Sequence, residues 1–169
     1  MNPVKFRLFM MNQTSIKFMR AGPLFAIALF LTADGLMANY AFYKKVGATC
    51  KYYRIESDTK NMNLTTNDKG SRNFSLILDS NRNNFEMVMI VGFISAGQAM
   101  LHQKSIAQKK EGYNPVVPEK VFITVNVPMG KQPMIVSAAA TEKQILSMVE
   151  GKIDSAEFMR QIKDSIQTL

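Results

Sequence analysis

The stretch "KVFITVNVP", Lys120 to Pro128, gives the clearest local prediction in the chain. Apolar and polar side chains alternate along it, and an alternation of period two is typical of a β-strand with one buried face. The buried face would hold Val121, Ile123, Val125 and Val127. A turn through "PMGKQP" leads into "MIVSAAA", so the sequence predicts an antiparallel hairpin near residues 120–139.

A long helix is predicted before this hairpin, over Phe85–Glu111. Its first half is apolar on nearly all sides and its second half is polar and basic, which is typical of a helix buried at one end. Glu86 and Gln98 leave an apolar run shorter than the roughly 20 residues of a membrane span, which favours core packing. A buried strand over "MVMIVGFI" remains an alternative that periodicity does not separate.

Two short helices are predicted after the hairpin, because each begins with a capping pattern. Thr141 with Gln144 precedes "EKQILSMVEG", and Asp154 with Glu157 precedes "SAEFMRQIKDSIQTL". On the last helix, one stripe of apolar residues predicts packing against the rest of the domain: Phe158, Met159, Ile162, Ile166 and Leu169.

Further strands are expected upstream, because a two-stranded hairpin alone is only marginally stable. "CKYYRI" (50–55) and "FSLIL" (74–78) have strand-like composition, and the polar residues 58–73 between them predict a loop or a hairpin connection. The predicted fold class is therefore α+β. It has a small antiparallel sheet with its main hairpin near 120–139, one long helix before it and two short helices after it.

The N-terminal part of the chain is typical of an export leader. "LFAIALFL", Leu24 to Leu31, follows a basic segment and is interrupted by Asp34 and Gly35, which makes it short for a membrane-spanning helix. We therefore expect a signal peptide over residues 1–38, cleaved near 38–41 after Ala38 or Ala41, and a single α+β domain over 42–169. A membrane anchor from about Ala21 to Tyr43 is the first alternative, and a buried helix of the mature fold is the second.

Charge and composition set only broad limits on function. The 169 residues have a net charge of +8 and 47% hydrophobic residues, which excludes wholesale disorder. Removing residues 1–38 lowers the net charge to +5, because four cations and one acid are lost. This modest surplus predicts a solvated basic surface rather than a nucleic-acid partner.

Residues that carry catalytic or metal chemistry are few. Cys50 is the single cysteine and His102 the single histidine, and neither has neighbours at the spacing of a zinc site or of a nucleophile motif. We therefore expect no metal, no cofactor and no catalytic residues. Lys104, Lys109, Lys110 and Tyr113 form a candidate binding cluster, for which a solvated helix end is the simpler interpretation.

These features favour an exported protein of the periplasm or envelope, or a secreted one, that acts as a binding or assembly module rather than as an enzyme. The expected partner is another protein and not nucleic acid, with membrane association and oligomerisation both open. The alternative is a membrane-anchored accessory subunit of a membrane complex. A small hydrolase that uses His102 is the third hypothesis.

Overall fold

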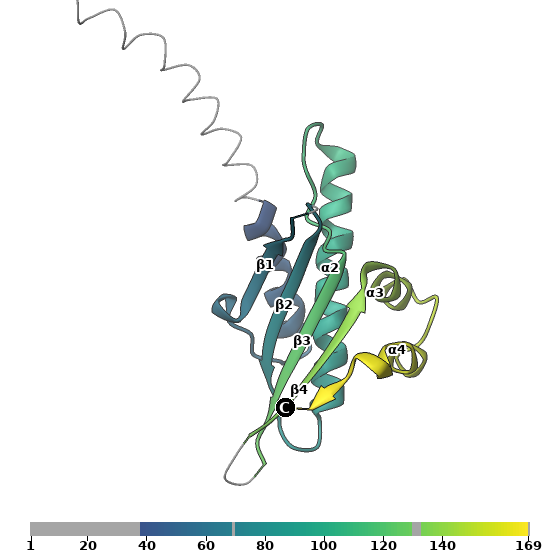
Figure 1. Ribbon diagram of the computed structural model, residues 1–169. Helices are drawn as coiled ribbons and strands as arrows, with labels where there is room; N and C mark the ends of the chain where they lie inside the picture. Colours follow the sequence, from purple (N-terminus) through teal and green to yellow (C-terminus); the bar gives the residue numbers. More distant parts are fainter. Residues whose placement is uncertain (1–37, 69, 130–132, 169) are drawn as a thin grey trace, which may run out of the picture.

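The computed structural model describes residues 38–68, 70–129 and 133–168. Within them, helices cover one face of a five-stranded sheet, and the other face is open to solvent (Figure 1). The strands lie side by side in chain order: β1 (Met62–Thr66), β2 (Arg72–Asp79), β3 (Lys120–Val127), β4 (Met134–Thr141) and β5 (Gln167–Thr168). This arrangement confirms the predicted α+β class.

The first described helix covers residues 38–52, and it is followed by α2 (Phe85–Lys109), α3 (Glu142–Val149) and α4 (Ser155–Ile162). Two short 3-10 helices are also present, η1 (Thr59–Asn61) and η2 (Lys163–Ser165). Both predicted caps are confirmed: Thr141 and Gln144 form a capping box, and the Asp154 side chain accepts from the Glu157 backbone N–H at 2.7 Å. The final helix is shorter than predicted, because α4 ends at Ile162 and the chain then turns back to pair β5 with β4.

The prediction of a purely antiparallel sheet was wrong, because β2 and β3 run parallel. Phe74 lies opposite Val121, and Leu76 lies opposite Ile123. Helix α2 follows β2 and carries the chain back along the sheet, so β3 starts at the same end as β2. The predicted hairpin is confirmed, with Lys120 of β3 opposite Thr141 of β4.

The strand predicted over residues 50–55 is also wrong. These residues end the 38–52 helix, and the Arg54 and Ile55 N–H groups donate to the carbonyls of Lys51 (3.0 Å) and Cys50 (2.9 Å). That pattern closes a helix with a residue in the left-handed conformation, here Arg54 with φ of 61°. The first strand instead lies inside the polar stretch, as β1, and forms a hairpin with β2.

The 38–52 helix packs into the core of the domain. Its buried residues recur every fourth position, at Ala38, Phe42, Val46 and Cys50. The Phe42 ring meets the Phe74 ring of β2 edge to face at 5.0 Å. The Tyr43 hydroxyl accepts from the Leu64 backbone N–H at 2.9 Å, so this helix also protects part of the edge strand β1.

Helix α2 approaches its neighbours closely through two glycines. A Cβ atom at Gly92 would lie 2.9 Å from the Ile123 Cγ2 atom of β3, and one at Gly97 would lie 2.8 Å from side-chain atoms of Ile145 and Val149 on α3. By length and composition α2 could cross a membrane. Here it packs on the sheet and on α3, with its middle residues buried, as the core-packing prediction expected.

Gly97→Ala is expected to destabilise the protein by about 1–3 kcal/mol, because the added methyl group overpacks the contact with α3. Gly47→Ala is the matched control in the 38–52 helix, where the nearest atom to an added Cβ is 3.7 Å away. There the better helix propensity of alanine should stabilise the protein by up to about 1 kcal/mol. Chemical denaturation of both variants measures these opposite signs, and equal effects would contradict this account of α2.

Candidate functional site

The predicted binding residues all lie at or just beyond the C-terminal end of α2, but two of them have structural partners. The Lys104 ammonium pairs with the Glu142 carboxylate of α3 at 2.7 Å. The Tyr113 hydroxyl donates to the Gln103 side-chain oxygen at 2.6 Å. Lys109 and Lys110 are exposed at the helix terminus, where cations favour the helix dipole. The structure therefore brings the four residues to one region without forming a shared cleft.

Gln103 is a buried polar residue that the sequence did not single out. Its amide nitrogen donates to the Ala38 carbonyl at 3.0 Å, and its oxygen accepts from the Tyr113 hydroxyl and from the Val116 N–H at 3.1 Å. This single side chain thus joins α2, the start of the 38–52 helix and the loop that leads to β3. A fully buried amide needs such partners, so its role is structural.

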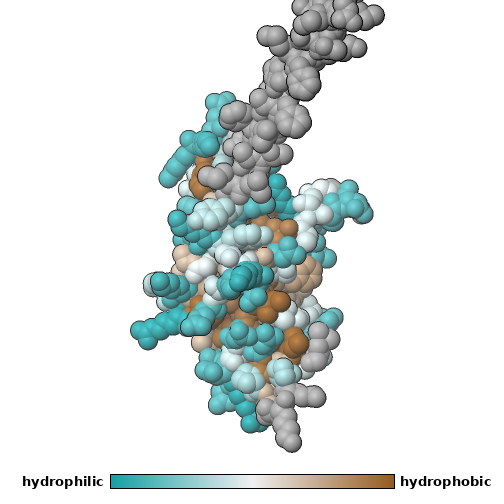
Figure 2. Space-filling view, turned by 90° about the vertical axis from the view of Figure 1, so that its left-hand side faces the viewer, coloured by the Kyte–Doolittle hydropathy of each residue, from teal (hydrophilic) through white to brown (hydrophobic). Residues whose placement is uncertain are grey.

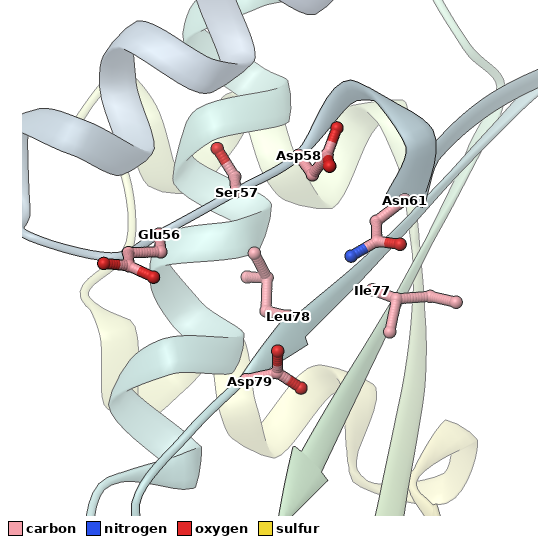
Figure 3. A pocket seen from close by; sticks show the side chains of 7 residues that line it. All are labelled: Glu56, Ser57, Asp58, Asn61, Ile77, Leu78 and Asp79. Atoms are coloured by element: carbon pink, nitrogen blue, oxygen red, sulfur yellow. The ribbon is translucent and has the colours of Figure 1, made fainter.

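A small recess of about 200 Å³ lies between the end of β2 and the segment before β1 (Figure 3). Its carboxylates, from Glu56, Asp58 and Asp79, point in different directions. Asp58 accepts from the Lys60 N–H at 2.9 Å, and Asp79 accepts from the Asn126 amide at 2.8 Å. Within the described ranges no group of three or more histidine, cysteine or acidic residues could hold a metal ion.

A second recess, of about 350 Å³, lies between the start of β2 and the loop before β3. Arg72 lies there and donates to the Pro115 carbonyl at 3.4 Å, while Glu119 and Glu142 contribute acidic walls. Small-molecule sites are typically walled by apolar and aromatic side chains. Both recesses are lined mainly by polar side chains instead.

The structure does not bring Cys50 and His102 together. The Cys50 thiol donates to the Ser95 hydroxyl at 3.3 Å inside the core, whereas His102 is exposed. Ser95 and His102 are seven residues apart on α2, which corresponds to about 10 Å along the helix axis. That separation is too long for the thiol–imidazole contact that nucleophilic catalysis requires.

Cys50 is expected to be inert to thiol reagents in the folded protein. Burial raises the pKa of its thiol above the ordinary value of 9.0, and only the thiolate is a strong nucleophile. Labelling with a maleimide at neutral pH should be slow in buffer and become fast with denaturant, following the unfolding curve. Rapid stoichiometric labelling of the folded protein would contradict the buried position.

The open face of the sheet carries two partly exposed apolar side chains. Phe122 on β3 and Ile77 on β2 are 40% and 41% exposed there. They are surrounded by polar side chains, and the hydroxyls of Thr124 and Ser137 lie 3.0 Å apart across β3 and β4. Seen from the side of β1, exposed apolar surface is likewise interleaved with polar surface (Figure 2).

Comparisons with models of known protein families, with curated proteins and with solved structures found no match to this chain.

Proposed function

We propose that the protein is an exported binding or assembly module of the cell envelope, whose folded domain begins before Ala38. Export is supported by the basic segment and the short apolar run of the leader. One observation carries the proposed start of the domain: Ala38 is buried, and its carbonyl accepts a hydrogen bond from the fully buried Gln103. The export leader therefore joins the domain at a residue that belongs to the core.

Cleavage at the two sites first considered would damage this core. A cut after Ala41 would place a charged α-amino group on Phe42, which is fully buried, and burial of an unpaired charge is costly. A cut after Ala38 would remove the acceptor of the Gln103 amide. The packing thus supports processing upstream of Ala38.

A cut after Gly35 fits both the leader and the fold. Ala33 and Gly35 supply small residues at the third and first positions before that bond, as signal peptidase sites require. Arg20 and Asp34 enclose only 13 uncharged residues, which suits the apolar region of a removable signal and is short for a bilayer span. The mature chain would then begin at Leu36.

Binding is favoured over catalysis by the surfaces that the described residues present. The two recesses are polar, and Cys50 is held away from His102. The open sheet face offers Phe122 and Ile77 within a polar surround, which supports a protein partner. Association through this face would require no rearrangement of the helices on the other face.

Cell fractionation followed by N-terminal sequencing of the native protein tests this proposal. The expected result is an envelope or periplasmic protein that begins at Leu36. A cytosolic protein with an intact leader would overturn the export proposal, and a chain that begins at Asn39 or Phe42 would overturn the proposed domain start.

A membrane-anchored accessory subunit is the second candidate. It is favoured by the exposed cations and tyrosines on the 38–52 helix, because Ala38 lies only seven residues after the end of the apolar run at Leu31. Recovery of the intact chain in the membrane fraction, resistant to alkaline extraction, would decide for this candidate.

A further inference from the structure

The outer face of the 38–52 helix carries tyrosines and cations along its whole length. Tyr40 and Tyr52 are 63% and 80% exposed, Lys44 and Lys51 lie exposed between them, and Arg54 follows at the helix end. We call these five residues the Tyr–Lys face. The opposite side of the same helix is buried, so this face is fixed outward by the core packing of Phe42 and its neighbours.

The Tyr–Lys face lies in a segment without any acidic residue. From Asn39 to Ile55 the chain has four cations, and the first carboxylate after them is Glu56. Cations near a helix C-terminus favour the helix dipole, which accounts for Lys51 and Arg54. Lys44 lies near the middle of the helix and has no such explanation.

Arg54 occupies a backbone position that glycine would fill at lower cost. Its φ of 61° lies in the left-handed region, which is unfavourable for a residue with a Cβ. The domain thus retains a cationic side chain at the end of the Tyr–Lys face despite a local conformational penalty.

We propose that the Tyr–Lys face binds the anionic headgroups of a lipid bilayer. Tyrosine is enriched at membrane interfaces, and lysine and arginine reach headgroup phosphates with their long side chains. Each cation near an anionic surface strengthens binding about fivefold. The choice of a bilayer over nucleic acid as the polyanion rests on the proposed export, because an exported protein meets the surface of a membrane and seldom meets nucleic acid.

Binding by the Tyr–Lys face needs no retained leader, so it is tested on the purified native protein with vesicles. Flotation is measured with phosphatidylcholine vesicles and with vesicles that also contain phosphatidylglycerol. We expect binding only to the anionic vesicles, and weaker binding as salt is raised. The double variant Lys44→Glu with Lys51→Glu should bind at least about tenfold more weakly. Lys143→Glu with Lys163→Glu, an equal charge change on the α3 and η2 side, should bind as the native protein does.

Arg54→Gly separates a binding role from a structural one. It should raise the unfolding temperature, because glycine relieves the left-handed strain, and at the same time weaken vesicle binding about fivefold. Equal binding to neutral and anionic vesicles would overturn the inference, as would equal losses in the two double variants. An added oligonucleotide should not displace the protein from the vesicles. Binding of the protein to the oligonucleotide without vesicles would also overturn the inference. A cytosolic location would overturn the export proposal while leaving these vesicle measurements intact.

Discussion

Phe42→Ala is expected to lower the free energy of unfolding by about 3–5 kcal/mol, the usual cost of removing a buried phenylalanine ring. Phe42 is fully buried, and its ring meets the Phe74 ring of β2 at 5.0 Å with an interplanar angle of 77°. Removal of the ring leaves a cavity between the 38–52 helix and the sheet. A loss of this size is a large fraction of the stability of a typical domain.

Urea denaturation monitored by circular dichroism measures this effect. Tyr40→Ala is the matched control, because Tyr40 lies on the same helix and is 63% exposed, so its removal should change stability by less than about 0.5 kcal/mol. If Phe42→Ala were as mild as the control, the 38–52 helix would not be part of the cooperative core. The proposed start of the domain before Ala38 would then lose its physical basis.

The sequence carried enough information for the elements whose side-chain pattern has a single interpretation. Val121, Ile123 and Val125 alternate strictly, and β3 forms there; the capping residues Thr141 and Asp154 start α3 and α4 where expected. The parallel pairing of β2 with β3 has no signal in the pattern of either strand. It follows from the order of the predicted elements, because a long helix between two strands carries the chain back along the sheet and makes the second strand parallel to the first.

The 38–52 helix did leave a signal in the sequence. Ala38, Phe42, Val46 and Cys50 recur at a spacing of four, which is typical of one helix face, and this spacing runs through both cleavage sites considered first. The small residues Ala38 and Ala41 also fit a signal-peptidase site, so the same stretch carries two competing patterns. Burial of Ala38 in the structure favours the helix.

The role of Gln103 could not have been predicted from the sequence. It lies in the polar half of a long helix, where most glutamines face solvent, and its partners are 65, 10 and 13 residues away along the chain. The same contacts give Tyr113 a structural role. Tyr113 follows the basic residues Lys109 and Lys110 in sequence, which placed it in the predicted binding cluster, but its hydroxyl donates to the side chain of the buried Gln103.

Gln103→Leu is expected to destabilise the protein by about 2–4 kcal/mol, because buried polar groups lose their partner. Leucine has a similar volume, so the loss arises from hydrogen bonding rather than from a cavity. The Val116 N–H, on a fully buried residue, would be left without its acceptor, and the Ala38 carbonyl would lose the donated amide hydrogen. Gln98→Leu is the control on the same helix: Gln98 is half-buried, makes no side-chain hydrogen bond within the described part of the chain, and should change stability by less than about 0.5 kcal/mol.

A double-mutant cycle with Tyr113→Phe separates the network from simple packing. Tyr113→Phe alone removes only the hydroxyl that donates to the Gln103 oxygen at 2.6 Å, with an expected cost of about 0.5–1.5 kcal/mol. Once Gln103 is leucine, that hydroxyl has lost its acceptor, so its removal should cost little or nothing. The double variant should therefore be more stable than the sum of the single losses predicts, by a coupling of about 1 kcal/mol. Strictly additive losses would show that Gln103 and Tyr113 act independently and that the buried amide does not organise this end of the domain.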